Sequence, residues 1–208
     1  MSFVGIDLTA GARPTAVAAL AEDLREQRIE LLLTDGELLG FVEEAQATIV
    51  AVDAPLGLPA GQCCLEQECG CAPRGPGSGR ECERALSRLG MGCYYTTKRS
   101  IIKAMVYRGI GLRRRLEARG CTVIEVYPYA SKVRLFGARP PRKMGQAGRT
   151  FMADRLSSLL TRDIPLMSHD EADALICAYT AYLYARGDTE ALGDAAEGRL
   201  HIPAILSL

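Results

Sequence analysis

The chain has 208 residues, 48% of them hydrophobic and 24% charged, values typical of a soluble globular domain. Its first residues carry an acid at Asp7 and no long apolar run, which excludes a signal peptide. No segment reaches the ~20 apolar residues of a membrane helix. We therefore expect one cytoplasmic domain over residues 1–208, with reduced thiols and no membrane partner.

Positive charge is concentrated in one part of the chain. The formal net charge is zero, but residues 98–149 contain 14 Lys or Arg and only two acids, so that this segment carries +12 and the rest −12. Such a block predicts a surface that contacts a polyanion, although charged runs are also common on solvated surfaces. The residues expected to contact nucleic-acid phosphates are Arg113, Arg114, Arg115, Arg142 and Lys143.

The first half of the chain reads as three strands, a helix and a fourth strand. An apolar run over 3–6 ends at Asp7, and runs over 14–20 and 28–34 follow at hairpin-like intervals. Apolar residues recur at helical spacing over 36–46 and predict a short helix, with Asp35 as its N-terminal cap. The β-branched run 48–52 predicts a buried strand that ends at Asp53.

The second half begins with a segment rich in Gly, Pro and Cys, residues 60–97, which we interpret as an inserted loop region. After it we expect, in chain order, a helix from 101 toward 115, a strand at 122–127, a loop at 137–149, and helices at 151–161 and 168–186. A tail over 188–208 follows the last helix. Three strands in a meander, then strand, crossover, strand and closing helix, predict an α/β protein with a mixed sheet.

Acidic residues lie at the ends of the predicted apolar strands. Asp7, Asp53 and Glu125 occupy such positions, and strand ends of neighbouring strands meet in one crevice. Asp170 and Asp173 lie three apart on one face of the last helix. Clustered carboxylates repel unless a cation neutralises them, and hard oxygen ligands suit Mg²⁺ or Mn²⁺. This donor set is typical of metal-activated water attacking a phosphodiester, with Asp7, Asp53, Glu125, Asp170 and Asp173 as the expected catalytic acids.

Some of these acids also have a structural interpretation. Glu125 could pair with a nearby Arg or Lys. Ser168 and Glu171 form a capping box, and Asp170 would then favour the first turn through the helix dipole. His169 could assist proton transfer or be an exposed first-turn histidine.

The four acidic motifs, VGIDLT, VDAPLGLP, VIEVYPYA and HDEADALICAYTA, together resemble a bacterial and archaeal domain-of-unknown-function family described as predicted nucleases of RNase H-like fold. The last helix is also similar to the closing helix of RuvC-type junction resolvases. The resemblance implies a five-stranded sheet of order 3-2-1-4-5 flanked by helices. It also implies metal ligation by Asp7, Asp53 and Asp173, although many relatives carry Glu where this chain has Asp53.

Six of the eight cysteines fall within residues 63–93 without an accompanying histidine. An all-thiolate site for zinc, or an iron–sulfur cluster, is therefore possible, with redox disulfides as the alternative. If four are chosen, the expected ligands are Cys69, Cys71, Cys82 and Cys93.

The sequence thus predicts a metal-dependent nuclease that acts on DNA or RNA. Two alternatives stay open: an actin-like phosphotransferase, suggested by the turn after Asp7, and a non-catalytic nucleic-acid-binding module that uses Cys-bound metal for structure.

Overall fold

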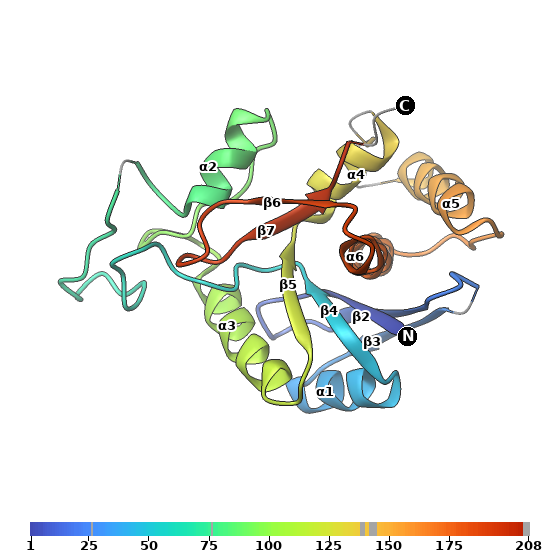
Figure 1. The fold of residues 1–208 in the computed structure, drawn as a ribbon, viewed down its shortest axis with the longest axis horizontal. Helices are drawn as coiled ribbons and strands as arrows, with labels where there is room; N and C mark the ends of the chain where they lie inside the picture. Colours follow the sequence, from blue (N-terminus) through green and yellow to red (C-terminus); the bar gives the residue numbers. More distant parts are fainter. Residues whose placement is uncertain (26, 76, 138–139, 142–144, 206–208) are drawn as a thin grey trace.

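A computed structural model of the protein describes every residue except 26, 76, 138–139, 142–144 and 206–208. The described residues form one mixed sheet with helices on both faces (Figure 1). Its strands are β1 (Ser2–Asp7), β2 (Thr15–Ala21), β3 (Gln27–Leu32), β4 (Ala47–Val52), β5 (Thr122–Val126), β6 (Thr189–Leu192) and β7 (Leu200–Pro203). The helices are α1 (Asp35–Glu44), α2 (Glu81–Arg88), α3 (Lys103–Glu117), α4 (Pro128–Phe136), α5 (Gln146–Leu160) and α6 (His169–Ala185).

The strand order is β3-β2-β1-β4-β5-β7-β6. β1 pairs antiparallel with β2 and parallel with β4, and β4 continues in parallel to β5. The predicted order 3-2-1-4-5 is therefore confirmed. The segment 188–208, expected to be a tail, instead supplies β6 and β7, which extend the sheet beyond β5.

Other elements also differ from the expectation. The inserted region contains the helix α2, and α4 follows β5 directly, with Pro128 at its first position where proline is favoured. Thr34, not Asp35, caps α1. The capping box of Ser168 and Glu171 at the start of α6 is confirmed by hydrogen bonds of 3.2 and 2.8 Å.

The two faces of the sheet carry separate cores. Alternate residues of β1 and β4, such as Val4, Ile6, Val50 and Val52, pack against α1 and α3. The opposite face packs against α6, where Phe3 and Ala51 contact Cys177. Figure 1 shows α1 and α3 on one side of the sheet and α4, α5 and α6 on the other. Because the central strands are buried on both faces, their sequences are continuous apolar runs.

α6 lies unusually close to β1. A Cβ atom added at Gly5 would lie 2.1 Å from the Ala174 carbonyl oxygen and 2.2 Å from the Ala178 nitrogen. Both are backbone atoms, so no side-chain rotation could relieve the overlap. Small residues along α6, Ala174 and Ala178 among them, allow this approach, and Gly5 makes it possible from the sheet side.

We predict that Gly5→Ala lowers the free energy of unfolding by roughly 1–3 kcal/mol or more, because the helix must shift away from the strand. The matched control is Gly40→Ala on α1, where a Cβ meets nothing within 4 Å; it should stabilise the protein by up to about 1 kcal/mol. Urea unfolding measures both. Equal midpoints for the parent and Gly5→Ala would contradict the close packing of α6 on β1.

Candidate functional site

Two acids lie at the same edge of the sheet, at the ends of neighbouring parallel strands. β1 ends at Asp7, and Asp53 directly follows β4, with its backbone N–H donating to the Ile6 carbonyl at 2.8 Å. Side chains alternate along a strand, so Asp7 is on the face of Phe3 and Gly5. Asp53 lies in a bend after β4 and lines a cavity that also includes Arg80 and Glu125. Gly5 and Ala51 belong to the same face of the sheet. That face is the one covered by α6.

α6 supplies a third acid to this region. Asp173 lies one helical turn before Cys177 and is only 3% exposed. One of its carboxylate oxygens accepts from the Lys132 ammonium of α4, and the other lies 3.0 Å from His169 Nε2. Burial by itself would raise the pKa of Asp173, but the contacts with His169 and Lys132 outweigh it and lower the pKa. Asp173 is therefore a carboxylate at neutral pH.

The buried thiol of Cys177 lies within the influence of all three acids. Burial is the main reason why its pKa is raised, and the negative charges of Asp53, Asp7 and Asp173 raise it further. The structure therefore brings three of the five expected acids, from β1, β4 and α6, to one region beside the closing helix.

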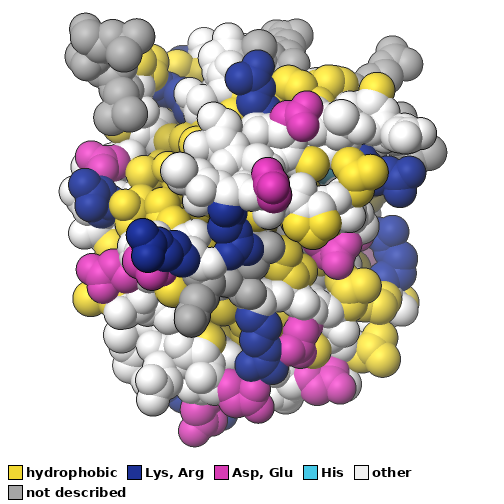
Figure 2. Space-filling view, turned by 90° about the vertical axis from the view of Figure 1, so that its right-hand side faces the viewer, with side chains coloured by type: hydrophobic (Ala, Val, Ile, Leu, Met, Phe, Trp, Pro, Cys, Tyr) yellow, Lys and Arg dark blue, Asp and Glu magenta, His cyan; other side chains and the backbone are white. Residues whose placement is uncertain are grey.

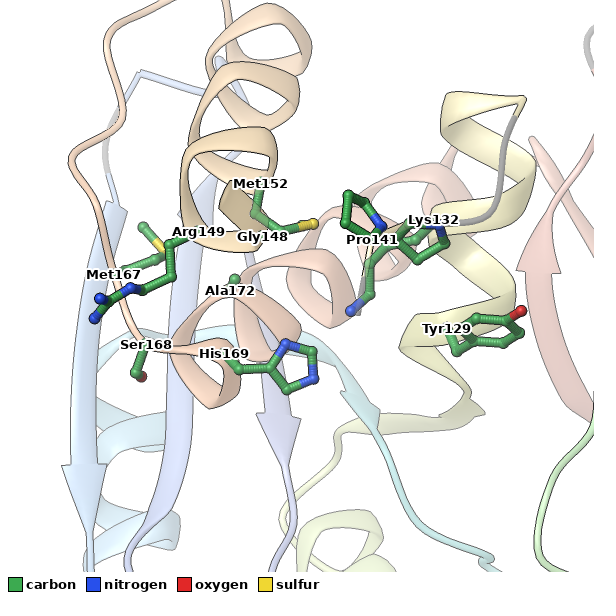
Figure 3. A pocket seen from close by; sticks show the side chains of 11 residues that line it. Tyr129, Lys132, Pro141, Gly148, Arg149, Met152, Met167, Ser168, His169 and Ala172 are labelled. Atoms are coloured by element: carbon green, nitrogen blue, oxygen red, sulfur yellow. The ribbon is translucent and has the colours of Figure 1, made fainter. Parts of the chain in front are cut away.

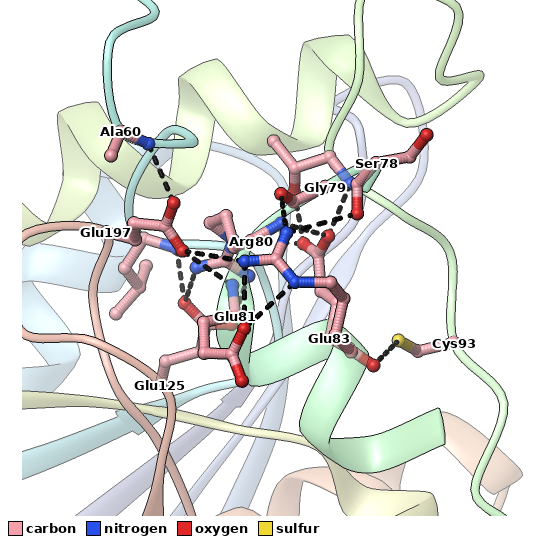
Figure 4. Close-up of polar contacts among 12 residues, drawn as sticks. Ala60, Ser78, Gly79, Arg80, Glu81, Glu83, Cys93, Glu125 and Glu197 are labelled. Carbon is pink, nitrogen blue, oxygen red and sulfur yellow. Dashed lines mark hydrogen bonds and ion pairs between the residues drawn. The ribbon is translucent and has the colours of Figure 1, made fainter. Parts of the chain in front are cut away.

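Glu125 lines a cavity together with Asp53, but its own contacts are different. Its neighbours Ile124 and Val126 pack on the α6 face, so the Glu125 side chain points to the opposite face. Both of its oxygens accept from Arg80, at 2.6 and 2.7 Å, and one also accepts from the Leu56 backbone at 2.7 Å (Figure 4). The structure therefore shows the pairing alternative, in which Glu125 binds a buried arginine, and the catalytic role expected for Glu125 stays a prediction.

Arg80 itself links the inserted region to the sheet. It is 1% exposed, and its Nε donates to Glu83 at 2.9 Å. Glu83 also accepts from the backbone and the hydroxyl of Thr96, at 2.8 and 2.5 Å. The two acids satisfy the guanidinium by charge-assisted hydrogen bonds, and the pKa of Arg80 is raised above its usual value because their charges outweigh burial.

Asp170 is exposed in the first turn of α6. A carboxylate there interacts favourably with the helix dipole. The structural interpretation of Asp170 therefore fits its position better than a role as a ligand.

Sequence reasoning missed a cavity of about 230 Å³ beside Asp173. It lies between α4, α5 and the start of α6 (Figure 3), and its lining includes Tyr129, Lys132, Arg149, Met152 and His169. Lys132 and His169 are the two residues that contact Asp173. A single lysine in a short helix gives no sequence signal that it is buried, so only the packing of α4 on α6 reveals it.

The three consecutive arginines do not all share one surface: Arg113 and Arg114 line a common pocket, and Arg115 is not part of it. They lie on α3, on the sheet face opposite α6, and successive helix residues point about 100° apart. Arg113 Nε donates to Glu117 at 2.7 Å, Arg115 pairs with Asp35, and Arg114 is exposed. Arg142 and Lys143 lie outside the described residues. On the side of the molecule seen in Figure 2, basic side chains are interspersed with acidic ones.

The cysteines form two groups that differ from the expected set. The thiol sulfurs of Cys63, Cys64, Cys69 and Cys71 all lie within 4.8 Å of one another. Within the part of the chain that the structure describes, no other set of three or more potential ligands lies so close, and Asp7, Asp53 and Asp173 do not reach that distance.

Cys82 and Cys93 lie elsewhere, against Leu86, Met91 and Leu200. Burial raises the pKa of each of these two thiols to about 12. The pKa of Cys71, by contrast, is lowered to about 6 by backbone hydrogen bonds from Cys64 and Cys63. The choice of Cys69, Cys71, Cys82 and Cys93 is thus corrected: the structure joins the first two to Cys63 and Cys64.

A mixed sheet of this order, with a closing helix against its first strand and acids at the strand ends, defines an RNase H-like fold. Comparison with known proteins agrees. The chain belongs to the family described as "Protein of unknown function (DUF429)", whose model matches residues 5–198. Among solved structures, the chain is similar to RuvC of Thermus thermophilus, with a TM-score of 0.50 and 14% identity over 96% of this chain and 100% of that one. No curated protein matches. No helix among the described residues is long and apolar enough to span a membrane.

We predict that Glu125→Gln destabilises the fold by roughly 3–5 kcal/mol, because it leaves the Arg80 guanidinium buried with an incomplete charge partner. Asp170→Asn, at an exposed position, should change the free energy of unfolding by no more than about 0.5 kcal/mol. Chemical denaturation of both variants measures this difference. A Glu125→Gln variant as stable as the parent would show that the Arg80 pairing is not what Glu125 provides.

Proposed function

We propose that the protein is a divalent-metal-dependent nuclease whose centre is formed by Asp7, Asp53 and Asp173. The observation that carries the proposal is the placement of these three carboxylates. Asp7 and Asp53 follow neighbouring parallel strands at one edge of the sheet, and Asp173 comes from α6, whose backbone packs on β1. The likeness to RuvC shows the fold, and the resemblance of the last helix to RuvC-type junction resolvases supports a nuclease activity on that fold.

The donor set fits Mg²⁺ or Mn²⁺. These hard cations prefer carboxylate oxygens and are usually held by one or two carboxylates together with waters, so they do not require all three acids in direct contact. Asp7 and Asp53 are the proposed direct ligands, and Asp173 of α6 is the third acid of the centre. When bound, such an ion activates water and stabilises the charge that develops on the attacked phosphate.

Residues of the neighbouring cavity favour a phosphate-bearing substrate. Lys132 neutralises Asp173, and His169 lies against the same carboxylate. Together with Arg149 they place positive or proton-donating groups beside the acids, which offsets the repulsion between carboxylates and a polyanion. Tyr129 and Met152 supply apolar surface against which a base can pack.

The test of this function is a cleavage assay with single-stranded and duplex DNA, RNA and branched DNA, each with Mg²⁺ or Mn²⁺. We expect cleavage that requires the metal. Asp7→Asn should reduce the cleavage rate while binding of the substrate persists. The reduction should exceed the roughly 10–100-fold that is lost when a residue that only orients a metal ligand is replaced. Asp170→Asn is the matched control and should cut like the parent.

Two outcomes would contradict the proposal. One is cleavage by Asp7→Asn at the parent's rate. The other is phosphate transfer from ATP with none of the nucleic acids cut, which would favour the actin-like alternative.

The position of the substrate-binding surface can be tested separately. Arg149 is exposed at the cavity beside Asp173, whereas Arg114 is exposed on the opposite face of the sheet. Each lost phosphate contact should reduce the slope of log affinity against log salt by about 0.9 on duplex DNA. We therefore expect Arg149→Ala to weaken binding and flatten the slope, and Arg114→Ala to change neither. The reverse result would place the nucleic acid on the α3 face.

A further inference from the structure

The loop over residues 60–74 is closed at its base but has almost no core of its own. The backbone N–H of Arg74 donates to the Ala60 carbonyl at 2.6 Å. Gly61 lies within this closure with a φ of +86°, and a Cβ there would lie 2.7 Å from the Ala72 carbonyl oxygen. Of the loop's side chains, Leu65 is the fully buried hydrophobic one. A loop of this kind needs a further crosslink to keep one conformation.

Four thiols lie at the centre of this loop. Cys63, Cys64, Cys69 and Cys71 come from a stretch of nine residues, and their sulfurs lie within 4.8 Å of one another. The sulfurs of Cys63 and Cys69 are 3.6 Å apart. A tetrahedral zinc site with Zn–S bonds of about 2.3 Å has sulfur–sulfur edges of about 3.8 Å, so the arrangement is close to that of a four-thiolate site.

The surrounding contacts hold the loop in the orientation that gathers the sulfurs. The backbone N–H of Leu65 donates to the Tyr107 hydroxyl of α3 at 2.7 Å, and that hydroxyl donates to Glu66 at 2.8 Å. The Lys98 ammonium donates to the Cys69 carbonyl. These bonds fix the segment between the second and third cysteines from outside and leave the thiols facing one another.

We propose that Cys63, Cys64, Cys69 and Cys71 bind one zinc ion that fixes the inserted loop against α3. With four protein thiolates the coordination is closed, as in structural rather than catalytic zinc sites. Zinc fits better than a multi-iron cluster, because the metal and sulfide atoms of a cluster would hold its cysteine sulfurs further apart than these. Cys82 and Cys93 are not part of the site.

The experiment uses the full chain purified without added metal and without chelator. Elemental analysis should find about one zinc per chain. Cys64→Ser and Cys71→Ser should each lose most of it. Cys93→Ser, which removes a thiol outside the cluster, should retain it, and this control separates the four proposed ligands from the set that includes Cys82 and Cys93.

A second readout tests the loop directly. Arg74 is exposed at the end of the loop, so removal of zinc by a chelator should speed tryptic cleavage after Arg74 while the far-ultraviolet circular dichroism of the sheet and helices is unchanged. Cleavage at the same rate with and without zinc would overturn the structural role. A preparation without metal in which the four thiols titrate freely, or are paired in disulfides, would overturn the site, and bound iron would overturn the identity of the ion.

Discussion

The contact between Gly5 of β1 and the backbone of α6 is the constraint on which the candidate site depends. Backbone atoms of Ala174 and Ala178 occupy the space that a Cβ atom at position 5 would need. If α6 moved along or away from β1, Cys177 would lose its packing against Phe3 and Ala51. Because Asp173 lies one turn before Cys177, this contact places its carboxylate near the strand ends that carry Asp7 and Asp53. The fold therefore determines the site through a glycine that bears no functional group.

Much of the fold could be predicted from the sequence, and the missed parts share a physical cause. The central strands β1 and β4 are continuous apolar runs, so their burial could be predicted from the sequence, and the family resemblance implied their order in the sheet. β6 and β7 are four residues each and lack such a run. Their position depends on long-range contacts. Glu197, between them, accepts from the Ala60 and Glu81 backbone at 2.8 and 2.5 Å and so connects the start and the middle of the insertion to this segment.

The site was predicted in part, and register explains the difference. Asp7 and Asp53 end strands whose alternate residues face α6, and the sequence pattern was sufficient to pair them. Glu125 lies near the end of a similar strand, but its partner in the sheet is Val52, which faces α1 and α3. The Glu125 side chain therefore points to that face, and there it binds Arg80. A one-residue difference in register reverses the face of a side chain, and sequence alone does not give the register. The cysteine ligands were misassigned because spacing cannot show which thiols a loop brings together.

The most direct test of the central claim is a crystal structure of the parent protein soaked with Mn²⁺, with the ion located by its anomalous scattering. The account predicts a peak bound by carboxylate oxygens of Asp7 and Asp53 at about 2.0–2.5 Å, beside Asp173, and no such peak in crystals of Asp7→Asn. Manganese found only at exposed acids such as Asp170, with none between Asp7 and Asp53, would contradict it.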